Sequence, residues 1–365
     1  MDVAPTRDDT YPSPQRQEVE GLVQSVVALL SPERTTLYIP SREGLMVIAA
    51  NTEVVGGTRL LSLGAYRPRR VIENDEVAAN AAVDEEWIRE RTGIERRRFA
   101  DADEDIAYMA IAAGRAALEA ADMSPDLVEL VVLASCTQRF PIPSSAPAIA
   151  HGLGISSPGA FDLNAVCAGF SYALASASAL VRVGAARVAL VVASERNSDW
   201  THPGAADVYP IFGDGAGAAL VGASETTGIG PVVWGSDGGR AGFIGLAGDP
   251  ARIRMDGPLV FKWAVETMPR VAHEACARAG VGIDDIAWLV PHQANLRIVD
   301  LVAARLGFDL TRVTRDVIEC GNTSAASIPM ALCRLREERG ATGDLALLLG
   351  FGAGLGFAGQ VVALP

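Results

Sequence analysis

The pattern of apolar positions becomes regular from Thr58 onward, where it alternates between the periods of strands and helices. Short apolar runs predict buried strands at 60–63, 130–134, 161–163 and 188–193. Apolar residues at helical spacing, with end signals such as Asp84 and Gly93, predict helices at 84–93, 105–121, 142–153 and 168–183. Because strands alternate with helices, we expect an α/β fold whose sheet is covered on both faces.

The chain also repeats itself at an offset of roughly 156–158 residues. The helix and strand at 117–133 find an echo at 275–290, and the strand at 189–192 recurs at 345–348. We therefore predict two related βα halves, 58–228 and 229–365.

Residues 1–57 precede these halves as an N-terminal extension, which we expect to be partly disordered. Within it, residues 20–30 are a candidate short amphipathic helix, and residues 35–50 show no clear period. The extension is either a regulatory arm or the result of a start site assigned too early, with Met46 as the true start.

Composition narrows the class of protein. The 365 residues are 49% hydrophobic, which suits a globular protein with a large core. A net charge of −13 without a basic stripe argues against nucleic-acid binding. No apolar run reaches the length of a membrane span and no signal peptide is evident, so we expect a cytoplasmic protein. Five scattered cysteines fit free thiols, and four histidines without ligand spacing predict no metal site.

A cysteine stands at the junction of a predicted strand and the next predicted helix. The stretch Phe161–Phe170 carries Cys167 just before the helix at 168–183. The positive end of a helix and its unpaired N–H groups lower the pKa of a thiol and make it nucleophilic. Most cysteines are buried and structural, so this alternative stays open for Cys167 taken alone.

Two polar residues in the second half are candidates for the same site. His292 follows the apolar run Trp288–Pro291, at a strand end where ligands bind in open α/β sheets. The repeat offset applied to Cys167 leads beside Asn322, which we expect to follow a strand and precede a helix rich in small residues. Taken singly, His292 is compatible with a structural histidine and Asn322 with a helix cap.

The last candidate is a glycine-rich turn after the apolar run 345–351. It contains a G-x-G-x-x-G pattern at Gly354, Gly356 and Gly359. In dinucleotide-binding proteins this pattern opens a helix, whereas the segment 361–364 is strand-like. We instead expect backbone N–H groups of this turn to bind an oxyanion.

The segments around Cys167, His292 and Asn322 occur together with one further motif, Phe212–Ala218. The four segments are Asn164–Phe170, Phe212–Ala218, Pro291–Ile298 and Gly321–Pro329. In this combination the chain resembles β-ketoacyl-ACP synthase III, the initiating condensing enzyme of fatty-acid synthesis, from Thr58 to Pro365 and nearly without gaps. The resemblance implies a thiolase-like fold, a five-layered α-β-α-β-α sandwich, and a homodimer.

The resemblance assigns a role to each candidate. Cys167 is acylated by a primer thioester, acyl-CoA or acyl-ACP, and the N–H groups of Cys167 and Ala353 hold the oxyanion. Malonyl-ACP then enters, and His292 and Asn322 donate hydrogen bonds to its thioester carbonyl while CO2 leaves. The resulting carbanion attacks acyl-Cys167 and gives 3-oxoacyl-ACP. No cofactor takes part.

The resemblance also implies contacts to the substrates. Trp87 and Arg91 match residues that bind the adenine and pantetheine arm of coenzyme A, and Asn295 matches a pantetheine contact. A packed core aromatic is the alternative for Trp87. Ile142 matches a position that reaches across the dimer and limits the primer pocket, and Phe351 belongs to the substrate site.

Two arginines of one predicted helix form a candidate docking face for the acyl carrier protein. Arg297 and Arg305 lie two turns apart, where they would attract an acidic partner. The alternative is an ordinary solvated face.

One position departs from the family pattern. Where the family has an arginine that stacks on the adenine opposite the tryptophan, this sequence has Ala206. Loss of such a contact costs about 0.5–2 kcal/mol of binding free energy. We hypothesise a specialised paralogue, for example of polyketide metabolism, whose donor is carrier-bound. The rival interpretations are an acyltransferase that does not decarboxylate and a non-catalytic partner subunit; the intact set Cys167, His292 and Asn322 favours condensation.

Overall fold

A computed structural model describes residues 36–41, 44–49 and 55–365 of the chain. The chain divides into two compact units, Met1–Glu53 and Val54–Pro365. In the first unit, β1 (Thr36–Ser41) and β2 (Gly44–Ala49) pair as an antiparallel hairpin. The sequence did not predict this hairpin, because its residues do not alternate between apolar and polar. The helix predicted at 20–30 lies outside the described residues.

The second unit contains two large sheets. The first has the strand order β3-β9-β8-β6-β7, in which β6, β7 and β8 are parallel and β9 is antiparallel to β8 and β3. Its strands are β3 (Gly57–Tyr66), β6 (Leu130–Ala134), β7 (Gly159–Leu163), β8 (Val188–Arg196) and β9 (Asp214–Ser224).

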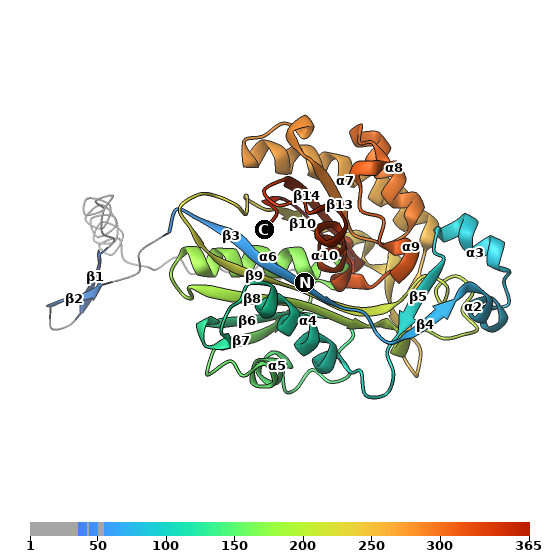
Figure 1. Cartoon of the computed structure of the whole chain (residues 1–365), viewed down its shortest axis with the longest axis horizontal. Helices are drawn as coiled ribbons and strands as arrows, with labels where there is room; N and C mark the ends of the chain where they lie inside the picture. Colours follow the sequence, from blue (N-terminus) through green and yellow to red (C-terminus); the bar gives the residue numbers. More distant parts are fainter. Residues whose placement is uncertain (1–35, 42–43, 50–54) are drawn as a thin grey trace, which may run out of the picture. The chain divides into compact units, whose positions relative to one another are not determined.

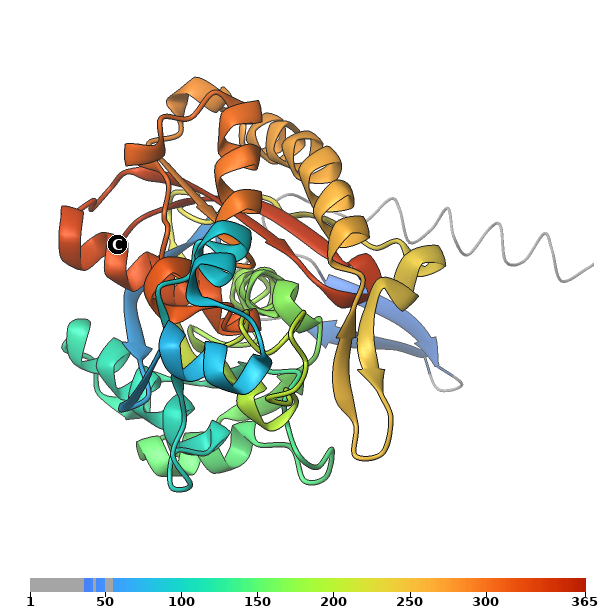
Figure 2. The ribbon, with the colours of Figure 1, turned by 90° about the vertical axis from the view of Figure 1, so that its right-hand side faces the viewer.

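The second sheet has the order β10-β15-β14-β13. Its strands are β10 (Val233–Gly235), β13 (Trp288–Pro291), β14 (Leu345–Phe351) and β15 (Phe357–Ala363). Two small antiparallel pairs complete the strands: β4 (Arg70–Glu73) with β5 (Arg96–Phe99), which are joined through two helices, and the hairpin of β11 (Ile244–Ala247) with β12 (Arg252–Met255). Figure 2 shows the β11–β12 hairpin as a projection from the start of the helix that follows it.

Helices connect and cover the sheets. They are α2 (Asn74–Ala81), α3 (Glu85–Thr92), α4 (Ile106–Ala120), α5 (Ala146–Leu153), α6 (Gly169–Arg182), α7 (Gly257–Ala279), α8 (Leu296–Leu306), α9 (Val317–Cys320) and α10 (Ser327–Arg339).

The second unit is built in five layers (Figure 1). Helices α4 and α5 pack on the outer face of the first sheet, and α7 and α8 pack on the outer face of the second. Helices α6 and α10 lie between the sheets and share one hydrophobic core with the inner faces of both. The predicted α-β-α-β-α sandwich is thereby confirmed.

Strand β6 shows why the layers form. All five residues of its sequence Leu-Val-Val-Leu-Ala are buried. Alternate residues point to opposite faces of a strand, so Leu130 and Val132 join the core around α6, whereas Val131 and Leu133 join the core under α4 and α5. A strand buried on both faces is apolar throughout, which is why the sequence predicts it well.

Two predictions about single elements were wrong. The helix expected at 142–153 begins only at Ala146, because a residue that precedes proline is disfavoured in helical conformation and Ile142 precedes Pro143. The strand expected before Asn322 is instead the short helix α9. The chain there makes only isolated bridges, such as Val313 with Leu289 of β13.

The internal repeat is visible in one turn of each half. Val166 and Ser324, 158 positions apart (324 minus 166), both have a positive φ of 50°. Each N–H donates to the side-chain oxygen of an asparagine two residues before it, Asn164 at 3.1 Å and Asn322 at 2.8 Å. Asn322 is thus the counterpart of Asn164. One residue after Val166 comes Cys167, at the start of the central helix pair.

Candidate active site

One cavity of about 770 Å³ opens into the second unit and joins residues from 87–212 with residues from 242–352. Its lining includes most of the residues that the sequence singled out: Trp87, Arg91, Cys167, His292, Asn295, Arg297, Asn322 and Phe351. Ile142, Arg305 and Ala353 do not belong to the lining, although Gly352, the neighbour of Ala353, does.

Cys167 lies in the short 3-10 helix η2 (Val166–Ala168), directly before α6. Its side chain is buried, and its Sγ lies 3.5 Å from the hydroxyl of Ser324. Val166 holds a left-handed conformation that a β-branched residue rarely adopts. Such strain is common where a chain fixes a reactive group.

The acidity of the thiol differs from the sequence-based expectation. Burial raises the pKa of Cys167 to about 12, and the nearby charge of Glu195 raises it further, whereas a hydrogen bond from Ser324 opposes the rise. The expectation that the helix terminus lowers this pKa was wrong. Desolvation of a largely buried thiolate outweighs the partial charge of one helix end. The raised pKa favours the thiol form of Cys167 near pH 7.

His292 lies just beyond β13, and its Nδ1 is 2.6 Å from the hydroxyl of Ser327. The N–H of Gln293 donates to the same hydroxyl oxygen at 3.4 Å. When the hydroxyl donates to Nδ1, the proton of the neutral imidazole resides on Nε2. Burial lowers the pKa of His292 to about 3, so the ring is neutral near pH 7. Phe351 stands edge-on to it at 5.3 Å.

Asn322 has a fixed amide orientation. Its Oδ1 accepts the N–H of Ser324 at 2.8 Å, so the Nδ2 group is the part of the amide left to donate to a ligand. Its backbone is pinned as well, because its N–H donates to Ile211 O at 2.9 Å and its carbonyl accepts from Gly213 N at 3.0 Å. A neutral imidazole N–H and an amide N–H are both donors suited to a carbonyl oxygen.

The glycine-rich turn packs directly against Cys167. A Cβ on Gly352 would lie 2.7 Å from the backbone N of Cys167. The N–H of Gly352 donates to Gly356 O at 2.9 Å and is therefore occupied. Ala353, the next residue in η8 (Ala353–Leu355), is the sequence-predicted second oxyanion donor, and this role stays a prediction.

Sequence reasoning missed four polar residues of this region: Glu195, Ser324 and the partly buried Cys136 near Cys167, and Ser327 beside His292. Glu195 is fully buried and accepts a hydrogen bond from Ser324 at 3.0 Å. One signal was present, since Glu195 is an acidic residue at the carboxyl end of the apolar run of β8, where parallel strands place ligand contacts.

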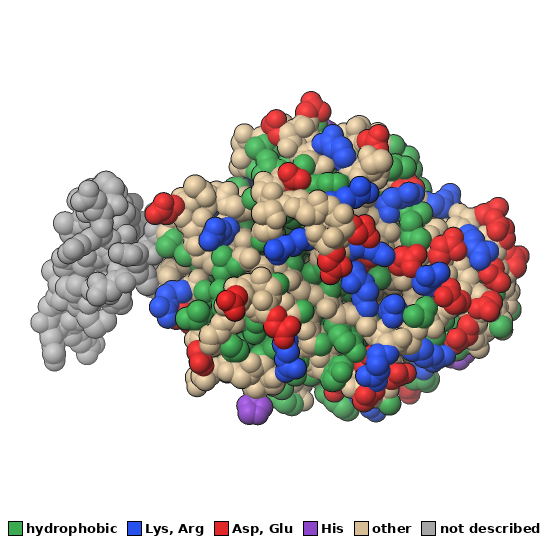
Figure 3. Space-filling model, in the orientation of Figure 1, with side chains coloured by type: hydrophobic (Ala, Val, Ile, Leu, Met, Phe, Trp, Pro, Cys, Tyr) green, Lys and Arg blue, Asp and Glu red, His purple; other side chains and the backbone are tan. Residues whose placement is uncertain are grey.

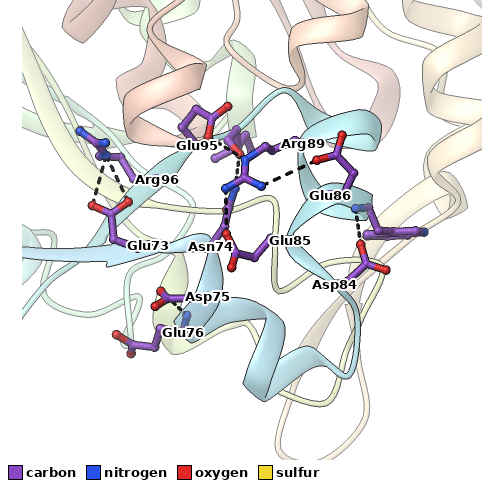
Figure 4. A network of polar contacts seen from close by, with 12 residues as sticks. Glu73, Asn74, Asp75, Glu76, Asp84, Glu85, Glu86, Arg89, Glu95 and Arg96 are labelled. Atoms are coloured by element: carbon purple, nitrogen blue, oxygen red, sulfur yellow. Dashed lines mark hydrogen bonds and ion pairs between the residues drawn. The ribbon is translucent and has the colours of Figure 1, made fainter.

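Trp87 and Arg91 belong to α3 at the cavity wall. The carboxylate of Asp84 caps this helix by accepting the N–H of Trp87 at 2.6 Å. Arg89 then ties the helix down through Glu85 at 2.7 Å and Glu95 at 3.0 Å (Figure 4). The guanidinium of Arg91 lies 6.0 Å from the Trp87 ring centroid. Trp87 is partly exposed and lines the cavity, and it also packs against the small core around Val77 and Ile88.

Four other predicted contact residues have distinct surroundings. Asn295 caps α8 and donates through Nδ2 to Arg91 O at 3.0 Å, which joins α8 to α3. Arg297 lies over Phe261 at 5.6 Å, whereas Arg305 donates to Val265 O at 2.8 Å. Ile142 is 83% exposed.

Two general findings bear on chemistry. Among the described residues, no group of three or more histidine, cysteine, aspartate or glutamate side chains is arranged to hold a metal ion. None of the described helices combines the length and the apolar character that a membrane crossing requires.

The fold and the site define a class of protein. A five-layered α-β-α-β-α sandwich that brings a cysteine, a neutral histidine and an asparagine amide into one cavity is a condensing enzyme with a thiolase-like fold. Comparisons with known proteins agree. Residues 161–238 match the family model for 3-oxoacyl-[acyl-carrier-protein (ACP)] synthase III, and residues 276–364 match its C-terminal model.

Relatives narrow the class to a family. The chain is 46% identical over 317 residues to β-ketoacyl-[acyl-carrier-protein] synthase III 4 of Streptomyces coelicolor, covering 85% of this chain and 99% of the relative. It is 42% identical over 333 residues to the mycobacterial synthase III of Mycobacterium marinum, covering 88% of this chain and 99% of the relative.

Solved structures give the same answer. The priming β-ketosynthase of the R1128 polyketide pathway matches with a TM-score of 0.83 and 44% identity, over 85% of this chain and 97% of that one. The synthase III of Pseudomonas aeruginosa matches with a TM-score of 0.81 and 36% identity, over 85% and 98%. The chain belongs to the β-ketoacyl-[acyl-carrier-protein] synthase III family and is a condensing acyltransferase.

Proposed function

We propose that the chain condenses a primer acyl thioester with malonyl-ACP. The observation that carries this proposal is the cavity in which Cys167 meets two neutral donors, His292 and Asn322. Cys167 attacks the thioester carbonyl, the carrier thiol leaves, and the acyl group stays on sulfur. The N–H groups of Cys167 and Ala353 stabilise the oxyanion, and one such donor contributes about 3–4 kcal/mol in comparable sites.

The second half-reaction uses the other two residues. The malonyl thioester carbonyl accepts hydrogen bonds from His292 Nε2 and Asn322 Nδ2, which stabilise the enolate as CO2 leaves. Its carbon then attacks acyl-Cys167, the carbonyl re-forms, and Cys167 departs as thiolate. The pKa of His292, lowered to about 3 by burial, supports a neutral donor in this step. The products are 3-oxoacyl-ACP and CO2, and no cofactor is needed.

Carrier recognition relies on unpaired arginines at the cavity. On the face drawn in Figure 3, acidic and basic side chains intermix, most densely over α2, α3, β4 and β5. There Arg70, Arg89 and Arg96 pair with carboxylates. Within the described residues, Arg91 and Arg297 form no ion pair, and both line the cavity. We assign them to the phosphate of the carrier arm, and Arg297 with Arg305 to the acyl carrier protein itself.

The acyl donor is proposed to be carrier-bound. Ala206 lines the same cavity as Trp87 but presents only a methyl group, which cannot form a cation–π clamp on adenine. Similarity to a priming ketosynthase of polyketide biosynthesis supports the second candidate function, a starter-unit enzyme of secondary metabolism. Ala206→Arg is expected to tighten acyl-CoA binding by about two- to thirtyfold without a matching gain for acyl-ACP.

Assembly and location complete the proposal. Phe140 and Ile142 are 65% and 83% exposed in one apolar loop, which supports a homodimer in which Ile142 completes the pocket of the second copy. We place the enzyme in the cytoplasm, where its free cysteines stay reduced.

The function is tested by following both half-reactions. The chain is incubated with acyl-CoA and acyl-ACP, and the mass of the Cys167 peptide reports acylation. Release of labelled CO2 from malonyl-ACP reports decarboxylation. We expect Cys167→Ala to form no adduct, and Asn322→Ala to keep the adduct while losing CO2 release. Transfer of the acyl group to an alcohol or amine without CO2 would establish the rival acyltransferase. The absence of any adduct would indicate a non-catalytic subunit.

A further inference from the structure

A buried carboxylate without a role in the reaction described above lies beside the nucleophile. Glu195 is the second-last residue of β8, and its side chain has no exposed surface. Among residues 55–365 it makes no ion pair, and its hydrogen-bond donors are neutral hydroxyl, thiol and backbone N–H groups. A lone carboxylate is expensive to bury and is rarely retained without a purpose.

The two oxygens of Glu195 have different surroundings. Oε2 is anchored by Thr137 Oγ1 at 2.6 Å, Thr137 N at 3.1 Å, Ser135 Oγ at 3.1 Å and Cys136 N at 3.1 Å. Oε1 faces the nucleophile, with Ser324 Oγ at 3.0 Å and Cys136 Sγ at 3.3 Å as its side-chain contacts. Weaker backbone contacts to Oε1 come from Cys136 N at 3.3 Å and Ala325 N at 3.4 Å. Oε1 is therefore the oxygen that a proton from the Ser324 hydroxyl would reach.

Ser324 stands between this oxygen and the nucleophile. Its hydroxyl lies 3.0 Å from Glu195 Oε1 and 3.5 Å from Cys167 Sγ. A hydroxyl has one hydrogen, so it donates to only one of the two acceptors at a time. With the hydrogen toward Glu195, the oxygen can accept the thiol proton; with the hydrogen toward Cys167, it stabilises a thiolate. The two contacts are the start and the end of one proton transfer.

The backbone fixes Ser324 in this position. Its φ of 50° is left-handed, and its N–H is held by Asn322 Oδ1 at 2.8 Å. A non-glycine residue in this region costs on the order of 1 kcal/mol and persists only where surrounding contacts enforce it. The turn that orients the amide of Asn322 therefore also aims the hydroxyl of Ser324.

The charges favour exchange of a proton within the pair. Burial raises the pKa of both Cys167 and Glu195, and the charge of Glu195 raises the pKa of Cys167 further. Two negative charges in this enclosed site are unfavourable, whereas one is tolerated. Moving the proton from Cys167 to Glu195 keeps the total at one negative charge throughout.

We infer that Glu195 is the base that receives the Cys167 proton through Ser324 Oγ as the acyl group is transferred. The inference rests on the proposed acylation of Cys167. The S–H bond breaks as Ser324 accepts that proton, and the hydroxyl proton of Ser324 passes to Glu195 Oε1. The thiolate then bonds to the acyl carbon, and the carbon–sulfur bond to the carrier breaks. Return of the proton from Glu195 to the departing thiolate gives the free carrier thiol.

Glu195→Gln and Ser324→Ala test the inference by two measurements. Quenched single-turnover mass spectrometry gives the rate of Cys167 acylation from the acyl thioester that the wild type uses. Alkylation by iodoacetamide across pH gives the ionisation midpoint of the same thiol. Glutamine fits the site. Its carbonyl oxygen can replace Oε2 and accept the same hydrogen bonds, and its NH2 group can replace Oε1 and donate to Ser324 Oγ and Cys136 Sγ.

We expect the two readouts of Glu195→Gln to move in opposite directions. Removal of the neighbouring negative charge shifts the alkylation midpoint of Cys167 to lower pH. Acylation nevertheless slows by about 100-fold or more, because the base is gone, and its rate loses the acidic limb of its pH profile. A purely electrostatic or structural role predicts equal or faster acylation from the more acidic thiol, and that result would overturn the inference.

Two further comparisons keep the outcome decisive. Cys136→Ala is the matched control. Cys136 Sγ contacts Glu195 Oε1 at 3.3 Å and Ser324 Oγ at 3.4 Å, but the proposed proton path from Cys167 through Ser324 to Glu195 does not include Cys136. The Cys136→Ala variant should therefore acylate within about threefold of the wild-type rate. If Glu195→Gln does not fold, Ser324→Ala decides alone, and acylation at the wild-type rate by that variant refutes the relay. A wild type that forms no adduct refutes the proposed function instead.

Discussion

Gly352 is the position at which a single methyl group should disable the nucleophile. A Cβ there would lie 2.7 Å from Cys167 N, 3.0 Å from Cys167 Cβ and 3.2 Å from Cys167 Cα, whereas ordinary contacts begin at 3.4 Å. The atoms it meets are backbone atoms and a Cβ, which cannot rotate away. Gly352→Ala must therefore separate the end of β14 from the start of α6.

The magnitude follows from these contacts. The φ of Gly352 is −167°, an extended conformation that alanine also adopts, so the methyl contact alone is responsible. Overpacking of a filled interior costs about 1–3 kcal/mol of unfolding free energy. A shift of the reacting atom by roughly 1 Å lowers the rate by about 100-fold. We expect the loss of acylation to exceed greatly what the loss of stability explains.

Gly356→Ala is the matched control in the same turn. Its Cβ would meet only Ala353 O at 3.9 Å, and its φ of −67° is ordinary. Single-turnover acylation and urea denaturation of both variants make the comparison, and Gly356→Ala should remain close to wild type in each. If Gly352→Ala acylates at the wild-type rate, the close packing of the turn on Cys167 does not position the nucleophile, and the reasoning is refuted.

Three other predictions concern the supporting residues. Ser327→Ala removes the partner of His292 Nδ1 at 2.6 Å, and we expect CO2 release to fall about tenfold with acylation unchanged; equal loss of both would contradict this role. Because burial lowers the pKa of His292 to about 3, the unfolded chain binds more protons below pH 6.5, and stability falls as pH drops. His292→Gln should remove about 2 kcal/mol of the stability lost between pH 6.5 and 5 in urea titrations, and an unchanged pH slope would count against it. Arg97, fully buried, donates to Asn74 Oδ1 at 2.7 Å and Pro210 O at 2.8 Å, so Arg97→Met should lower the free energy of unfolding by about 2–4 kcal/mol; a loss below 1 kcal/mol in urea denaturation would show these bonds to be dispensable.

Most of the helices and strands could be predicted from local sequence patterns. The caps at Asp84 and Gly93 and the apolar run of β6 are interactions between near neighbours in sequence, and the elements formed where they predicted. The start of α5 was missed because Ile142 fits the helical period of apolar positions, although a residue before a proline is disfavoured in helical conformation. An apolar pattern reports which face is buried, but it does not report where backbone geometry stops the helix.

The environment of Cys167 was beyond the reach of local patterns. Its position at a helix start is local, and the sequence placed it well. Its pKa depends on enclosure by segments more than a hundred residues away, among them the turns of Ser324 and Gly352. Desolvation is a sum over all such neighbours, so a local argument from the helix terminus gave the wrong direction. The same holds for Glu195, whose donors come from separate loops.

The two halves, which we propose to be 58–228 and 229–365, use one inherited turn for different tasks. Asn164–Val166 and Asn322–Ser324 have the same asparagine-to-backbone hydrogen bond and the same left-handed residue. In the first copy the strained residue is Val166, and the chemistry falls to the next residue, Cys167. In the second copy the strained residue is Ser324 itself, and its hydroxyl reaches Cys167 Sγ at 3.5 Å. Because Cys167 and Asn322 line one cavity, we infer that the duplicated turn positions the proposed nucleophile in one half and the hydroxyl that relays its proton in the other.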